Sequence, residues 1–147
     1  MSQSIELRLC NEGWEEIQMT ADSGACDTVI PRGIGNFNPI VPLQKSLRAM
    51  EYEVANRQHI PNLGERRCMM WTEGASAPRG IVMQVADVHK PLLSLSRCAD
   101  LGYESRFGKL AGALIDNASG EVIPLVRKGN LYVFKDWVRA APFGRPE

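Results

Sequence analysis

The stretch MTADSGACDTVIP, residues 19–31, decides the fold of this chain more than any other. Before it, Ile17, Met19 and Ala21 alternate with polar residues, which predicts a short half-buried strand. An Asp-Ser-Gly-Ala turn follows, and a second apolar run begins directly after Thr28. This pattern predicts a β-domain that presents one carboxylate, Asp22, at a tight turn between two strands.

The residues after Asp22 suit a loop that holds a reactive carboxylate. Gly24 adopts backbone conformations closed to other residues, so it permits a sharp turn and a close approach by another backbone. The Ser23 hydroxyl can hydrogen-bond a neighbouring loop or the loop of a partner. Ala25 is small and leaves the approach to the carboxylate open. Residues 22–25 are therefore the candidate active-site loop.

Composition indicates one ordinary globular domain. The chain has 147 residues, of which 44% are hydrophobic and 23% charged, and its formal net charge is zero. No basic stripe is visible, so we expect no nucleic acid partner. No apolar run reaches the roughly 20 residues that span a bilayer, so we expect no membrane partner. The first ten residues alternate and carry charges, which is not typical of a signal peptide.

The cysteines and glycines do not indicate a bound metal or cofactor. Cys10, Cys26, Cys68 and Cys98 are widely spaced and form no C-x-x-C pair, so no zinc site is expected. Without a secretion signal we expect reduced thiols and a cytoplasmic location. Cys26 is close enough to Asp22 to line or support the site. The Gly-x-Gly at 33–35 lacks the third glycine of a dinucleotide site.

Short alternating segments separated by turns continue along the chain and predict an all-β barrel or sandwich. Residues 31–42 are rich in proline and glycine and read as a loop, and residues 43–50 allow a turn or two of helix. Ser96 could cap a short helix that ends at Gly102. The other expected elements are strands at 4–10, 14–21, 68–71, 81–85 and 131–133, a buried run at 92–95, and hairpins around 56–58 and 117–120.

The Asp22 segment resembles the active-site segment of retroviral-type aspartic proteases, the retropepsins. The chain downstream is similar to their copia-type retrotransposon branch, in the expected order from about residue 15 to 135. The residues that carry this resemblance are Tyr52-Glu53-Val54-Ala55-Asn56, Ile60 to Gly64, Asp87-Val88, Pro91 to Ser96, Asp100 to Tyr103, and Gly129 to Tyr132.

This resemblance implies a homodimeric aspartic endopeptidase that acts on a retroelement polyprotein. Each chain contributes one Asp22, and two carboxylates about 3 Å apart share a proton and activate a water molecule. It implies a retropepsin-like closed barrel with one or two short helices, one near residues 95–101. A single domain then covers 1–147, with a core at about 4–135 and an extension at 136–147. No cofactor or metal is implied.

The same resemblance assigns the substrate-binding residues. Ser23, Gly24 and Ala25 complete the active-site loop around Asp22. Residues 52–64 become a hairpin that covers the cleft, with the loop at 31–42 as a competitor for that role. The residues expected to contact substrate are Cys26, Asp27, Val54, Ala55, Asn56 and Ile60.

The chain departs from the retropepsin pattern in two places. Ser94 stands where many retropepsins carry glycine after two apolar residues, and Arg57 replaces a glycine at the hairpin tip. These departures keep open an inactive module that dimerises or binds peptides. A more distant alternative is an unrelated β-barrel with a chance Asp-Ser-Gly turn. Asp27 either faces the cleft or pairs locally, and Arg66 and Arg67 read as a solvated strand face.

Overall fold

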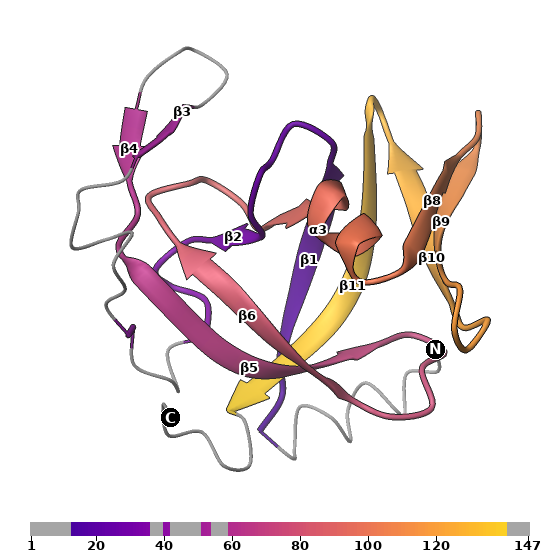
Figure 1. Ribbon diagram of the computed structural model, residues 1–147, viewed down its shortest axis with the longest axis horizontal. Helices are drawn as coiled ribbons and strands as arrows, with labels where there is room; N and C mark the ends of the chain where they lie inside the picture. The colour runs from indigo at the N-terminus through magenta and orange to yellow at the C-terminus, as the bar shows by residue number, and fades with distance from the viewer. Residues whose placement is uncertain (1–12, 36–39, 42–50, 54–58, 141–147) are drawn as a thin grey trace.

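The computed structural model describes residues 13–35, 40–41, 51–53 and 59–140 of the chain. Its centre is a closed β-barrel (Figure 1), which confirms the prediction of an all-β closed barrel. The ring closes because β11 pairs antiparallel with β1 on one side and with β5 on the other. In order around the ring, the strands are β1 (Glu15–Asp22), β7 (Leu92–Ser94), β2 (Val29–Ile30), β6 (Arg79–Val85), β5 (Gly64–Thr72) and β11 (Leu131–Ala140).

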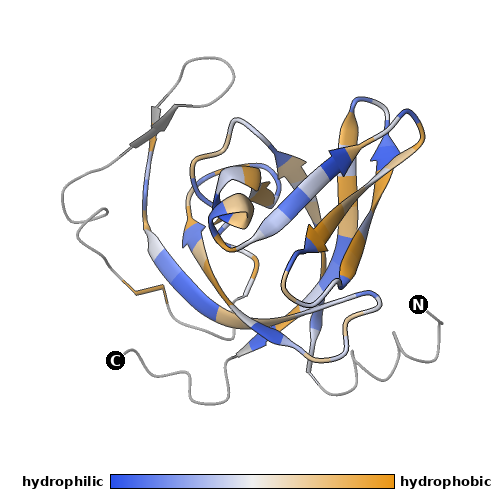
Figure 2. Cartoon of the chain, turned by 45° about the vertical axis from the view of Figure 1, so that its right-hand side comes forward, coloured by the Kyte–Doolittle hydropathy of each residue, from blue (hydrophilic) through white to orange (hydrophobic). Residues whose placement is uncertain are grey.

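Three further strands extend the sheet away from the barrel. Beyond β11 come β10 (Val122–Lys128), β9 (Ala111–Asp116) and the edge strand β8 (Tyr103–Phe107), all antiparallel. The expected hairpin around residues 117–120 is the turn between β9 and β10. Figure 2 shows hydrophobic colouring along most of β9 and β10, whereas β8 is mainly hydrophilic. Leu114 and Leu125 are almost fully buried and join the barrel core, so the extension and the barrel share one hydrophobic core.

The alternation that predicted β1 becomes an inside and an outside of the barrel. Ile17 and Met19 are buried, whereas Glu16 and Gln18 are exposed. On β6, Met83 and Val85 are fully buried, and Gln84 between them is also buried. Successive side chains of a strand point to opposite faces, so each strand contributes alternate residues to the core. Burying each such side chain stabilises the fold by about 1.5–3 kcal/mol.

The core continues past the expected boundary at residue 135. β11 runs to Ala140, and Asp136, Trp137 and Val138 have no exposed surface. Glu15 of β1 lies opposite Val138, and Trp71 of β5 lies opposite Trp137. The division into a core at 4–135 and an extension from 136 was therefore wrong. Residues 136–140 are part of the barrel strand β11. The charged residues Asp136 and Arg139 interrupt the apolar pattern by which a strand is recognised in the sequence.

The helix α3 (Leu95–Asp100) lies where the sequence placed it, but its capping residue is different. Ser94 precedes the helix in an extended conformation, and its side chain accepts a hydrogen bond from the Arg97 backbone N–H. This is the geometry of a helix N-cap. Ser96, the expected cap, lies within the first turn instead. The helix begins earlier because strand β7 ends directly at Ser94.

The hairpin expected at residues 52–64 is present in its described part. Strand β3 (Glu51–Glu53) pairs antiparallel with β4 (His59–Pro61). Its tip, with the expected site residues Val54, Ala55 and Asn56, lies outside the described residues. The same holds for the strand expected at 4–10 and the helical turns at 43–50. No helix in the described ranges has the length and apolar character needed to cross a membrane.

Arg66 is buried, so the expectation of a solvated strand face was wrong for this residue. Its side chain is 6% exposed and donates hydrogen bonds to the backbone carbonyls of Arg32 and Ile34. The N–H of Gly35 donates to the Glu15 carboxylate at 3.0 Å. Residues 32–35 are thus tied to the barrel by two charged side chains, a long-range arrangement that the local sequence pattern does not reveal.

Candidate active site

Asp22 is the last residue of β1 and begins an exposed turn. Its Oδ1 accepts a hydrogen bond of 2.8 Å from the backbone N–H of Gly24. Asp22 is half-exposed, and Ser23 and Gly24 are exposed. A Cβ added to Gly24 would lie 3.3 Å from Asp22 Oδ1, which is a tight contact. Gly24 therefore lets the backbone donor approach the carboxylate and fixes its orientation.

Strand β7 supports this turn from beneath. It runs parallel to the end of β1, with Ala21 opposite Leu93 and Asp22 opposite Ser94. Leu93 is 5% exposed and Ser94 is fully buried. The second part of the loop enters β2, where Val29 lies opposite Leu92 of β7. β7 thus lies between β1 and β2, the strands that enter and leave the loop, so the Asp22 turn rests on a packed strand.

Ser94 connects the loop with the helix through its side chain and its backbone. The Ser94 hydroxyl donates to the Ala25 carbonyl at 2.7 Å and accepts from the Arg97 N–H at 3.2 Å. Its backbone N–H donates to the Thr28 hydroxyl at 3.1 Å. The departure from glycine at this position therefore adds two hydrogen bonds that a glycine could not make. Sequence analysis noted the substitution but had no signal for its partners.

A second connection joins Asp27 to α3. Arg97 Nη2 lies 3.1 Å from Asp27 Oδ1, and Arg97 Nε donates to the Cys26 carbonyl at 3.2 Å. The Asp27 side chain is only 11% exposed. The structure shows Asp27 in an ion pair with Arg97, and its expected contact with substrate stays a prediction. Arg97 was not a sequence candidate, because its partner lies 70 residues away in the chain.

The remaining candidates are distributed over two regions. Ala25 and Cys26 follow the Asp22 turn, where Ala25 is half-buried and Cys26 is exposed. Ile60 is half-buried on β4, in the hairpin. Cys26 and Cys98 carry free thiols, and burial raises the pKa of the Cys98 thiol to about 11. A thiol with a raised pKa is a poor nucleophile at neutral pH, so Cys98 is a structural residue.

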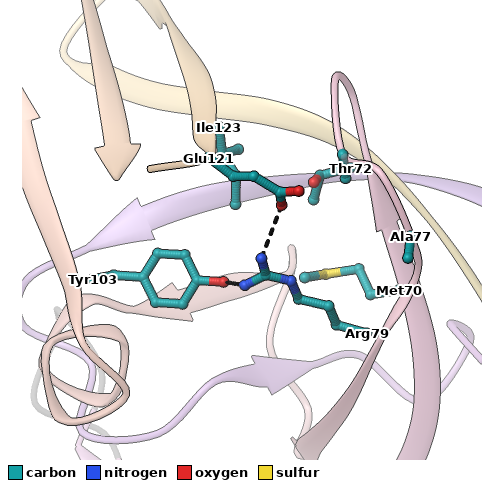
Figure 3. Close-up of a pocket in the computed structure, with 8 residues that line it drawn as sticks. Met70, Thr72, Ala77, Arg79, Tyr103, Glu121 and Ile123 are labelled. Carbon is teal, nitrogen blue, oxygen red and sulfur yellow. Dashed lines mark hydrogen bonds and ion pairs between the residues drawn. The ribbon is translucent and has the colours of Figure 1, made fainter. Parts of the chain in front are cut away.

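A second group of charged residues surrounds a pocket away from Asp22 (Figure 3). Arg79 of β6 lies 2.8 Å from Glu121 and 3.0 Å from Asp116, and it also contacts the Tyr103 hydroxyl. The Ser76 hydroxyl and Arg79 lower the pKa of Glu121, and the Ala118 N–H with Arg79 lowers that of Asp116. Each charge already has a partner. The cluster joins β6 to the extension and leaves no group for catalysis.

Within the described ranges, no group of histidine, cysteine and carboxylate side chains could hold a metal ion. The residues at Asp22 offer one oriented carboxylate, an exposed hydroxyl and an accessible backbone turn. Comparisons with protein-family models, curated proteins and solved structures found no match for this chain. What the fold and the site define is an all-β barrel that presents a single carboxylate at an exposed, well-supported turn.

Removal of the Ser94 hydroxyl is expected to weaken this support. Ser94→Ala removes the helix cap and the donor to Ala25, so the free energy of unfolding should fall by about 2 kcal/mol. Urea denaturation followed by tryptophan fluorescence measures this change. Ser96→Ala is the matched control, because it removes a hydroxyl that lies 3.1 Å from the Ser94 hydroxyl, whereas the hydrogen bonds to Ala25 and Arg97 belong to Ser94. Equal effects of the two variants would contradict the role of Ser94.

Proposed function

We propose that this chain is an aspartic endopeptidase that works as a homodimer. The observation that carries the proposal is the Asp22 carboxylate at an exposed turn, oriented by the Gly24 N–H and supported by β7 and α3. The turn resembles the catalytic loop of retropepsins in sequence.

A second copy completes the site in this proposal. The chain carries one Asp-Ser-Gly, so two chains are needed to bring two carboxylates together. Two-fold association is the commonest symmetry of soluble oligomers, and it places the same loop on both sides of the axis. The exposed Ser23 and Gly24 then meet the partner's loop. Of the two carboxylates, the ionised one takes a proton from water and the protonated one polarises the peptide carbonyl.

The β3–β4 hairpin is the proposed cover of the substrate cleft. Its base is fixed, because buried Asn62 donates to Gln84 at 2.8 Å and accepts from the Gly64 N–H at 2.8 Å. The competing loop, residues 31–42, is bonded to the barrel through both of its described parts, residues 31–35 and 40–41. Arg66 and Glu15 hold residues 32–35, and Val41 pairs with Glu65. The resemblance to retropepsins assigns the role of cover to the hairpin, and retroelement polyprotein segments are the proposed substrates.

The function is tested by incubating the purified chain with a peptide library between pH 4 and 8. We expect cleavage with a maximum on the acidic side of neutral, where a carboxylate pair holds one proton. Peptide mimics with a hydroxyl at the scissile position should inhibit it, and metal chelators and thiol blockers should not. A well-folded dimer without cleavage at any pH would point to the inactive peptide-binding module instead.

The dimer is a separate expectation. Sedimentation equilibrium should show a monomer–dimer equilibrium, with specific activity rising as protein concentration rises through the dissociation constant. Activity should depend on concentration because a monomer carries a single Asp22 and lacks the second carboxylate of the catalytic pair. Full peptidase activity at concentrations where only monomer sediments would contradict the two-chain site.

A further inference from the structure

Two turns lie next to each other where the extension meets β11. The β8–β9 turn (residues 108–110) and the β10–β11 turn (residues 129–130) lie side by side at the upper end of the molecule (Figures 1 and 2). The Tyr132 hydroxyl donates to the Gly108 carbonyl at 2.5 Å, and Arg127 donates to the Lys109 carbonyl at 2.8 Å. The Phe107 and Tyr132 rings are in contact on the face of the sheet that carries Arg127, with centroids 4.8 Å apart, whereas Lys128 and Leu131 are paired on the opposite face. We call this end of the sheet the turn patch, made of Phe107, Lys109, Leu110, Arg127, Lys128 and Leu131.

The turn patch combines exposed apolar side chains with positive charge. Leu110 is 83% exposed, Phe107 47% and Leu131 41%. Residues 107–112 and 126–133 contain three cationic residues and no carboxylate. In the described part of the chain, the hydrogen-bond partners of Arg127 and Lys128 are neutral, namely backbone carbonyls and the Gln18 amide oxygen. The charge is therefore not compensated within the described chain, although the whole protein has a net charge of zero.

The patch lies at the same end of the barrel as the Asp22 turn. In the antiparallel β1–β11 pair, Thr20 lies opposite Val133. Two positions nearer the end of β1 and the start of β11, the residues at the same level are Asp22 and Leu131. A polypeptide bound at Asp22 can therefore continue over these turns.

We infer that the turn patch binds acidic, apolar-rich segments of the polypeptide substrate, outside the bond that is cleaved. Charge complementarity favours an acidic partner, and the exposed leucines favour one that also carries apolar side chains. A second copy of the chain fits less well. Two-fold packing of the patch on itself would bring Lys109, Arg127 and Lys128 against their own copies. The inference rests on the proposed peptidase function, because it assigns the patch a substrate.

The test measures binding without cleavage. The Asp22→Asn chain is titrated into a fluorescein-labelled peptide in which Asp and Glu alternate with Leu and Phe, and anisotropy is recorded. A second peptide has lysine in place of each acidic residue. We expect the acidic peptide to bind and the basic one not to bind, with affinity falling as NaCl rises. Lys109→Glu with Lys128→Glu should weaken binding by roughly tenfold.

Matched controls separate the patch from general charge and hydrophobicity. Lys90→Glu reverses an exposed charge elsewhere, and Leu101→Ser removes a leucine that is 76% exposed outside the patch. Neither control should change the affinity, whereas Leu110→Ser should lower it severalfold. Equal effects of patch and control variants would overturn the inference. So would equal binding of both peptides, or binding of anionic vesicles or single-stranded RNA in place of the acidic peptide.

Cleavage by the wild-type chain tests the two proposals separately. Acidic peptide binding at the patch without any cleavage would refute the peptidase and leave the binding surface standing. A cleavage rate that changes neither with acidic flanking segments nor with the patch variants would refute the binding surface alone. The patch variants lie on exposed turns, and unchanged circular dichroism would show that the barrel is intact.

Discussion

Asp22→Asn is expected to abolish peptide cleavage while the fold and the dimer remain. Asparagine keeps the shape of the side chain and can still accept the Gly24 hydrogen bond through its amide oxygen. It cannot take a proton from water or give one to a carbonyl, so both roles of the carboxylate pair are lost. We expect kcat/KM to fall by a factor of about 10⁴ or more.

The measurement compares initial cleavage rates of wild type and variant on the best library peptide, with sedimentation as a check on the dimer. Asp87→Asn is the matched control. Asp87 is an exposed carboxylate, paired with Arg32 at 3.1 Å, and loss of such a surface pair has little effect on stability. The dimer of the Asp22 variant should be at least as tight as the wild type, since two close carboxylates repel each other unless they share a proton. An Asp22→Asn chain that cut at the wild-type rate would end the aspartic protease proposal.

Asp136→Asn is expected to change how stability depends on pH. Asp136 is fully buried on β11, between Ile17 of β1 and Thr72 of β5. Neither of its carboxylate oxygens has a hydrogen-bond partner in the described part of the structure. Burial raises the pKa of Asp136 well above its usual value, because the low-dielectric core disfavours the charged carboxylate.

The sign of the effect follows from proton binding. Between the unfolded pKa of about 3.9 and the raised folded pKa, the folded state binds more protons than the unfolded state. The contribution of Asp136 to stability is therefore present at acidic pH. It is lost as pH rises through this window, by up to about 1.4 kcal/mol per pH unit. Asp136→Asn removes the titration, so its free energy of unfolding should exceed that of wild type at pH 7 by more than it does at pH 4.

Urea denaturation at pH 4, 5.5 and 7 measures this difference. At each pH, the free energy of unfolding of wild type is subtracted from that of the variant. This difference isolates the effect of Asp136 from that of other carboxylates such as Asp116, whose lowered pKa acts in the opposite direction. We expect the difference between variant and wild type to grow steadily with pH. A difference that stays constant from pH 4 to 7 would mean that Asp136 is already ionised in the folded barrel.

Several elements could be predicted from local sequence. Ile17 and Met19 alternate with polar residues, and they became the inner face of β1. The Asp-Ser-Gly-Ala run predicted a turn, and Asp22 ends its strand there. The short helix near residue 95 and the hairpin around 117–120 were also placed correctly. In each case, the signal is a periodicity or a turn residue within about ten positions, which is the range over which backbone geometry governs the pattern.

The residues that failed prediction are those whose environment depends on distant partners. Arg66 reads as exposed by its charge, but two backbone carbonyls from residues 32–35 accept its hydrogen bonds. Asp136 was placed in an extension beyond the core, but neighbours on β1 and β5 bury it. A charged residue is buried only when the chain brings other segments around it, and periodicity within one strand does not report this.

Strand alternation and turn chemistry are local properties, so the sequence predicts an all-β chain with one carboxylate at a turn. The contacts of Ser94 with Ala25 and of Arg97 with Asp27, and the two turns that lie side by side in the turn patch, arise from the tertiary fold. These features join residues about 20 to 70 positions apart. Their existence depends on which strands become neighbours when the barrel closes, and that order is fixed by packing the whole core at once.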